Sequence, residues 1–246
     1  MTTERRLPPF DLRLAMDRLA AKDQRLARLM QSTEEFRTET DGTESPYAAL
    51  LEAVTYQSIS GKAAETIFNR VKALGAGRSA PSPVEMLKLP TRALRKAGLS
   101  GAKVRAMKDL ARKTLSGVVP SRAEAEALSD EELVARLISV RGVGAWTVEM
   151  FLIFRLGRPD VLPIHDLGVQ KGYALTYGKR YIPKPKELLA FGERWRPYRT
   201  VASWYMWRAV QRDSRKARKI GRAPAKKKNK RRKASRRQRT ASRVSR

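Results

Sequence analysis

The sequence contains no cysteine, and His165 is its single histidine. Without thiols the chain can form no disulfide, use no thiolate nucleophile, and bind neither zinc nor an iron–sulfur cluster through cysteine. It also lacks any apolar run near the roughly 20 residues that span a bilayer, and residues 1–6 lack the apolar region of a signal peptide. We therefore expect an intracellular protein that does not enter membranes.

Acidic residues are scarce beside basic ones. The chain has 53 Lys and Arg against 24 Asp and Glu, a formal net charge of +29. Residues 212–246 hold 18 of the basic side chains and one acid, Asp213, so the rest of the chain is also positive. Both parts should attract a polyanion, and nucleic acid is the first candidate partner.

Alternating strand patterns are nearly absent, and apolar residues recur at helical spacing between Pro, Ser and Gly. This pattern predicts an all-α fold. Two segments, beginning Ser82-Pro83 and Ser129-Asp130, have the form of capping boxes. We expect one helix through 12–29, others over 46–60, 61–75, 83–89, 91–97, 103–115, 129–138, 145–156 and 166–177, and two more that begin at Pro185 and Pro197.

After Arg215 apolar side chains almost disappear, and Ala, Ser, Lys and Arg dominate. Such a segment cannot bury enough surface to fold alone. We predict a folded domain over 1–216 and a disordered Lys/Arg-rich tail over 217–246. The basic run 226–233 resembles a nuclear-localisation signal or a nucleic-acid-binding arm, and a tail that only aids solubility is the alternative.

Residues 137–147 read as a helix end, a Gly-x-Gly turn and a new helix start. Gly142 and Gly144 allow the backbone to turn tightly and to approach a ligand, and the unpaired N–H groups of the following helix suit a phosphate. Taken alone, the same string fits an ordinary turn between two helices.

The longer string resembles a known family. Val140-Arg-Gly142-Val143-Gly144, with Trp146 and Thr147 after it, is similar to the hairpin of the helix-hairpin-helix DNA glycosylases. Pro163-Ile-His-Asp166, 22 residues beyond Gly144, resembles the Pro-containing loop and catalytic Asp of that Gly/Pro-Asp superfamily. The likeness extends over roughly 46–212 and is greatest to the 3-methyladenine DNA glycosylase II group, which removes alkylated purines.

The resemblance implies a two-lobed helical fold with the active-site cleft between the lobes. It implies a central lobe over about 60–165 and a second lobe made of the N-terminal and C-terminal helices. Asp166 would be the catalytic residue, stabilising the oxocarbenium-like sugar and orienting or deprotonating the attacking water. Bifunctional relatives carry a nucleophilic lysine where this chain has Trp146, so no lyase activity is expected. An alkylated purine leaves as a neutral base, and the sequence offers no obvious second acid.

A flipped, cationic base would be held between aromatic faces. By resemblance we expect Trp146 and Trp207 in this pocket, with Tyr56 and Tyr205 as further candidates, and Trp204 in the core. The DNA-binding candidates are Gly142, Val143, Gly144, Arg141, Gln57, Lys103 and Arg105, with Leu99 or Ser100 as the wedge that fills the gap in the duplex. Arg141 stands where many relatives have Pro and would add a phosphate contact. For His165 we expect a packing or hydrogen-bonding role.

Other functions remain open at this point. Asp near a helix start often serves only as a cap, which would suit a helix-hairpin-helix protein that binds DNA or RNA without catalysis. A glycosylase for mismatched or oxidised bases is the closer alternative. We expect a monomer that acts on damaged double-stranded DNA and needs no cofactor. The resemblance also suggests a monovalent cation at the hairpin carbonyls.

Overall fold

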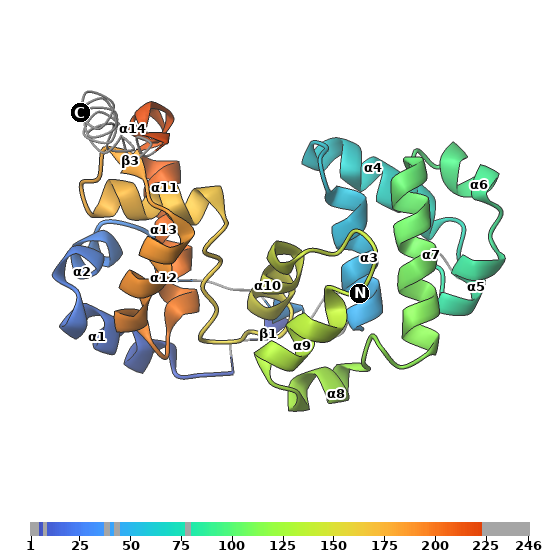
Figure 1. Ribbon diagram of the computed structural model, residues 1–246, viewed down its shortest axis with the longest axis horizontal. Helices are drawn as coiled ribbons and strands as arrows, with labels where there is room; N and C mark the ends of the chain where they lie inside the picture. Colours follow the sequence, from blue (N-terminus) through green and yellow to red (C-terminus); the bar gives the residue numbers. More distant parts are fainter. Residues whose placement is uncertain (1–4, 7–8, 37–39, 42–44, 77–79, 223–246) are drawn as a thin grey trace, which may run out of the picture.

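We describe the protein from a computed structural model of the 246-residue chain, which describes residues 5–6, 9–36, 40–41, 45–76 and 80–222. The described part is almost wholly helical, as the sequence predicts. Figure 1 shows the helices in two groups, one on each side of the central helix α10.

The helices are α1 (Leu12–Lys22), α2 (Gln24–Gln31), α3 (Pro46–Tyr56), α4 (Gly61–Lys72), α5 (Pro83–Lys88), α6 (Thr91–Lys96), α7 (Gly101–Leu115), α8 (Arg122–Ala127), α9 (Asp130–Leu137), α10 (Ala145–Phe154), α11 (Leu167–Thr176), α12 (Pro185–Gly192), the 3-10 turn η2 (Glu193–Trp195), α13 (Arg199–Arg212) and α14 (Ser214–Lys219). The strands are two-residue pairs: β1 (Arg5–Arg6) runs antiparallel to β2 (Thr40–Asp41), and β3 (Tyr181–Ile182) runs parallel to β4 (Gly221–Arg222).

The predicted capping boxes both form. The Ser82 and Ser129 hydroxyls accept from the backbone N–H three residues on, and Glu85 and Glu132 accept from the caps in return. Ser121 and Glu124 make a third box that sequence reasoning missed. These reciprocal bonds fix the starts of short helices that have little propensity to form alone.

The expected single helix through 12–29 is wrong, because Asp23 divides it into α1 and α2. The Asp23 carboxylate accepts from the N–H groups of Arg25 and Leu26, which caps α2. It also accepts from the Tyr177 hydroxyl at 2.5 Å and the Trp195 indole at 3.2 Å. This buried carboxylate joins the N-terminal helices to the C-terminal ones.

Two separate hydrophobic cores define the lobes. The central-lobe core draws on residues between Tyr47 and Val161, so this lobe includes α3 and begins before the expected residue 60. The second-lobe core combines residues 15–36 with residues 162–209. Chain segments at opposite ends of the sequence therefore build the second lobe, and α3 to α10 build the central lobe (Figure 1).

The connecting segment 157–165 is fixed to the second lobe before it reaches α11. Asp160 pairs with Arg199, whose Nε lies 2.8 Å from Oδ1, and with Arg196. Thr200 accepts from the Val161 N–H at 3.0 Å. These bonds hold the entrance to α11 in place.

The start of the predicted disordered tail is also corrected. Residues 217–219 belong to α14, Ala217 is buried, and β4 follows. Residues 223–246, which include the basic run 226–233, lie outside the described residues.

Candidate active site and nucleic-acid interface

The Gly-x-Gly segment forms a tight turn between α9 and α10. The Val143 N–H donates to the Val140 carbonyl at 3.0 Å, and Gly142 takes a φ of +77° that disfavours other residues. Asp109 on α7 accepts from the Arg141 N–H at 2.9 Å and holds the turn against the central lobe. A Cβ on Gly142 would lie 3.2 Å from that of Ala106, so the turn also packs closely on α7.

Gly144 caps α10 without any side chain. In the described structure the N–H groups of Gly142, Gly144 and Ala145 have no hydrogen-bond acceptor. Gly144 and Gly142 are exposed, whereas the Val143 side chain is buried in the core, so only the backbone of Val143 could meet a ligand. The turn therefore offers unpaired donors at a helix N-terminus, which is a favourable place for a phosphate.

Gln57 connects the end of α3 to this turn. Its Nε2 donates to the Gly142 carbonyl at 3.0 Å and to the Thr147 hydroxyl at 3.3 Å. Ser58, the next residue, has a φ of +60°, and Ile59 is 39% exposed. The Ser58–Ile59 loop, which sequence reasoning missed as a possible site of DNA contact, thus lies beside the hairpin.

Lys103 does not point to solvent as a phosphate contact would. Its ammonium donates to the carbonyls of Thr55 (2.7 Å) and Gln57 (2.8 Å) and so caps the C-terminus of α3. Its partial burial lowers the pKa of Lys103 from the ordinary lysine value. The predicted phosphate contact by this residue is therefore wrong, while Arg105 and Arg141 are exposed.

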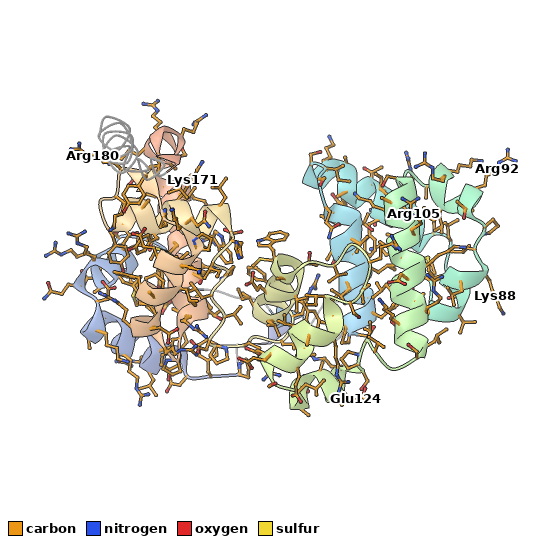
Figure 2. The ribbon with its side chains drawn as sticks, viewed as in Figure 1. Lys88, Arg92, Arg105, Glu124, Lys171 and Arg180 are labelled. Carbon is orange, nitrogen blue, oxygen red and sulfur yellow. The ribbon has the colours of Figure 1, made fainter. Side chains whose placement is uncertain are left out.

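Figure 2 places Arg105 in the central lobe and Lys171 in the second lobe, on the two sides of α10. Arg92 and Arg180 lie further out on the same two lobes (Figure 2). Positive side chains thus flank the segment that carries the hairpin from both directions.

Asp166 lies at the N-terminus of α11, and three N–H groups donate to its carboxylate. Oδ1 accepts from the Val169 N–H and from the Trp207 indole, each at 2.8 Å. Oδ2 accepts from the Trp146 indole at 2.7 Å. The backbone bond is a helix cap, and the two indoles come from α10 and α13, so the carboxylate sits where the two lobes meet.

Two glycines permit this arrangement. A Cβ on Gly168 would lie 2.7 Å from Cδ1 of Trp207 and 3.0 Å from Oδ1 of Asp166. A Cβ on Gly172 would lie 2.0 Å from the Met206 carbonyl oxygen, so α11 and α13 touch backbone to backbone. This close approach brings Trp207 to Asp166.

A pocket of about 630 Å³ lies between α3 and α10, beside the Trp146 indole. Its wall is mostly apolar and aromatic and includes Ala49, Ala53, Tyr56, Met150, Phe151 and Phe154. Arg155 and Glu52 pair in its lining at 2.5 Å. Phe154 also stacks on Trp207, with ring centroids 5.8 Å apart. The pocket has the size and aromatic character of a site for a planar heterocycle.

Several predicted site residues meet here and others do not. Tyr56 and Trp146 line the pocket, and Trp207 packs against Phe154 in its wall. Tyr205 has no exposed surface and lies in the second-lobe core, so its placement in the base pocket is wrong. Trp204 is 4% exposed, which confirms the prediction that it is a core residue.

Of the two residues predicted as the wedge, Leu99 is ruled out by its burial and Ser100 is not. Leu99 is 1% exposed and packs in the central-lobe core, so it cannot enter a duplex as it stands. Ser100 is exposed and caps α7 through the Lys103 N–H. His165 is exposed, and among the described residues its side chain makes no hydrogen bond, so the expected packing or bonding role is not seen.

Hydrogen bonds already occupy some of the hairpin carbonyls. Lys113 donates to the Ser139 carbonyl, and Gln57 donates to that of Gly142. A monovalent cation would need other carbonyls of the turn, and its presence stays a prediction. Within the described residues no cluster of three or more His, Asp or Glu side chains could hold a metal ion.

Glu149 is an acidic group of this region that the sequence analysis did not single out. It lies on α10, three residues after Trp146, and its Oε2 atom is buried without a hydrogen-bond partner in the described structure. Burial, followed by the negative charge of Asp166, raises the pKa of Glu149 to about 7. A second acid, which was not obvious in the sequence, therefore lies close enough to Asp166 for their charges to interact.

Sequence comparison finds a matching family model and similar proteins. The model of the HhH-GPD superfamily of base excision DNA repair proteins matches residues 51–197. A DNA-3-methyladenine glycosylase of Schizosaccharomyces pombe is 38% identical over 191 residues, which cover 77% of this chain and 84% of the relative.

Two solved structures are similar to this chain in both fold and sequence. The 3-methyladenine DNA glycosylase of Schizosaccharomyces pombe, in complex with abasic DNA, matches with a TM-score of 0.73 and 37% identity over 80% of this chain and 97% of that chain. A DNA-3-methyladenine glycosidase of Bacillus halodurans matches with a TM-score of 0.73 and 31% identity over 83% of this chain and 94% of that chain. No helix in the described part of this chain is long and apolar enough to cross a membrane.

Proposed function

This chain belongs to the HhH-GPD superfamily of base excision DNA repair proteins, and on that premise we propose how its residues release an alkylated base from DNA. It is a DNA glycosylase of the alkylbase type, a hydrolase that acts in base excision repair. The proposal assigns the catalytic step to Asp166, and the observation that carries it is the carboxylate fixed by two indole donors beside an aromatic pocket.

The reaction breaks the bond between C1′ of the deoxyribose and the base nitrogen. The bonding electrons leave with the alkylated purine, which becomes neutral, and the sugar becomes an oxocarbenium-like cation. The negative charge of Asp166 stabilises that cation. A water molecule then forms the new C1′–O bond, and Asp166 accepts the proton that the water loses. The products are a free base and an abasic site.

Trp146 has two parts in this proposal. Its indole N–H orients Asp166, and its exposed ring stacks on the cationic base that enters the pocket, with Tyr56 as a second aromatic wall. An indole cannot attack the sugar to form a Schiff base, so excision ends without strand cleavage, as in the monofunctional glycosylases.

The hairpin holds the DNA strand in this scheme. The free N–H groups of Gly142, Gly144 and Ala145 bind a phosphate beside the flipped nucleotide, and exposed Arg105 and Arg141 contact neighbouring phosphates. Ile59, an exposed apolar side chain beside Gln57, is a better wedge than buried Leu99, with Ser100 as the other candidate.

Asp166→Asn tests the catalytic assignment. The amide keeps the shape of the side chain but loses the negative charge, so we expect the single-turnover excision rate on methylated duplex DNA to fall by about 10²-fold or more. Binding to abasic DNA should change little. Wild-type product should break only after alkali treatment, which reports the absence of lyase chemistry.

Asp213→Asn is the matched control, because it makes the same chemical change at the junction of α13 and α14. It should excise bases at the wild-type rate. If Asp166→Asn also excises at that rate, Asp166 is not the catalytic residue. If wild type releases nothing from alkylated DNA but does so from mismatched or oxidised DNA, the substrate assignment is wrong.

A further inference from the structure

Glu149 and Asp166 are two carboxyl groups that differ in the hydrogen bonds they accept. Asp166 receives three N–H donors, whereas the buried Oε2 of Glu149 receives none from the described residues. Glu149 follows Trp146 by three residues on α10, so both side chains leave the helix on the same side. The indole that bonds Asp166 and the unpaired carboxyl thus belong to one surface of α10.

No basic side chain in the described structure pairs with Glu149. At the C-cap of α10, Arg155 pairs with Glu52 of α3, and both residues line the pocket. From the segment that precedes α11, the charged group that acts on Glu149 is Asp166 itself. A carboxyl group with a negative neighbour, partial burial and no donor is more stable as the neutral acid. In the free protein near pH 6, Glu149 is therefore mostly neutral.

We propose that Glu149 is a proton-linked second carboxyl of the active site, whose neutral form favours DNA binding and whose ionised form favours cleavage of the glycosidic bond. This inference rests on the proposed role of Asp166. A second negative charge would repel the DNA phosphates and weaken binding. The same charge would attract the sugar cation and lower the barrier of the chemical step.

Bound DNA should raise the pH at which Glu149 ionises. Phosphates bring negative charge toward Glu149, and this disfavours its ionised form. The rate of the bound enzyme should therefore rise with a midpoint above pH 7, whereas the affinity of the free enzyme should fall near pH 7, where the pKa of Glu149 lies. Glu149 acts on the sugar cation through its charge, beside that of Asp166, and touches no reacting atom, so it supports the catalytic residue and is not one itself.

Glu149→Gln separates this role from a structural one, because the amide has the same shape and never ionises. We expect the wild-type single-turnover rate to rise by up to about tenfold between pH 6 and pH 8.5, the size of one unit of pKa coupling. The rate of Glu149→Gln should stay near the wild-type value at pH 6. Affinity for abasic DNA should weaken with pH in wild type and remain flat in the variant.

Two further variants complete the test. Glu34→Gln, on the exposed segment after α2 in the second lobe, makes the same change away from the site and should keep the wild-type pH profile. Glu149→Asp retains a group that ionises and should retain a pH-dependent rate. Equal pH profiles for wild type and Glu149→Gln would overturn the proposal, even where Asp166→Asn abolishes excision as expected.

A direct titration tests the pair without relying on the fold of Glu149→Gln. Infrared difference spectra of the free wild-type protein should show a carboxylic acid that ionises near pH 7. In Asp166→Asn the midpoint should fall, because the neighbouring charge is gone. If no carboxyl titrates near pH 7, or if its midpoint is unchanged in Asp166→Asn, Glu149 is not coupled to Asp166 and the proposal fails.

Discussion

The two tryptophans that bond Asp166 come from different lobes and are held very differently. Trp207 is half-buried on α13, stacks on Phe154, and fits beside Gly168. Trp146 is 47% exposed at the start of α10. In the proposed mechanism the two indoles have different tasks: the second lobe holds the carboxylate in a fixed orientation, and the central lobe presents the aromatic face on which the flipped base would stack.

This division explains why the active site needs both lobes. The hairpin is anchored within the central lobe through Asp109, and it carries no acid suited to catalysis. The carboxylate belongs to α11, whose position depends on its contact with α13 and on the Asp160 ion pairs. In the proposed mechanism, DNA bound by one lobe is thus presented to a reactive group fixed by the other.

Gly172→Ala should have the largest effect on stability, because it disrupts the packing of α11 on α13 in the second lobe. The new methyl group would lie 2.0 Å from the Met206 carbonyl oxygen, and a backbone atom of a packed helix cannot move aside cheaply. We expect a loss of about 3 kcal/mol in the free energy of unfolding, measured by urea denaturation. Excision should fall with it, because α11 carries Asp166.

Gly61→Ala is the matched control for this change, since nothing lies within 4 Å of its added Cβ and its φ is ordinary. It should change stability by no more than about 1 kcal/mol. An unfolding free energy of Gly172→Ala equal to that of Gly61→Ala would mean that α11 and α13 do not meet as described.

Trp207→Phe and Trp146→Phe compare the two indoles directly. Phenylalanine keeps an aromatic ring but removes the N–H donor. Trp207 is half-buried, so water replaces its bond to Asp166 less readily than at an exposed site, and we expect the single-turnover rate to fall about tenfold. Trp146 is exposed, so water can replace its N–H, and the rate should fall only about threefold.

The ratio of the two rates checks the division of tasks. Both variants should bind undamaged duplex as wild type does, which serves as their control. A larger loss for Trp146→Phe than for Trp207→Phe would reverse the comparison and make the central-lobe indole the one that fixes Asp166.

Local strings in the sequence predicted the parts of the site that depend on local structure. The Gly142-Val143-Gly144 turn and Asp166 at the start of a helix follow from residues that are neighbours in the chain. Lys103 was misread because its partners, the Thr55 and Gln57 carbonyls, lie 48 and 46 residues away, and only the packing of α7 on α3 brings them within reach.

Apolar and aromatic side chains were misread for a related reason. Leu99 is of a residue type that suits a wedge, and Tyr205 is of a type that suits a base pocket. The same residue types also fill hydrophobic cores, and the sequence alone does not show which of these side chains are buried. Glu149 did leave a signal. It is the one acid in the strongly apolar stretch 145–154, and an acid in such a helix predicts either a partner or a shifted pKa.

The smallest effect is expected for the stability of Glu149→Gln, which tests the central lobe, where Glu149 and Trp146 share α10. Folding raises the pKa of Glu149 from the ordinary 4.5 to about 7, so between these pH values the folded protein holds a proton that the unfolded chain has released. The resulting stability is fully present below about pH 4.5 and is lost as the pH rises through about 7.

The amide variant has no such loss. It should gain on wild type as the pH rises from 4.5 to 8, by about 1 kcal/mol once solvent screening of this half-buried group is allowed for. Urea denaturation at the two pH values measures the difference, with Glu34→Gln as the control. A difference that does not change with pH would show that Glu149 ionises in the folded protein as it does in the unfolded chain.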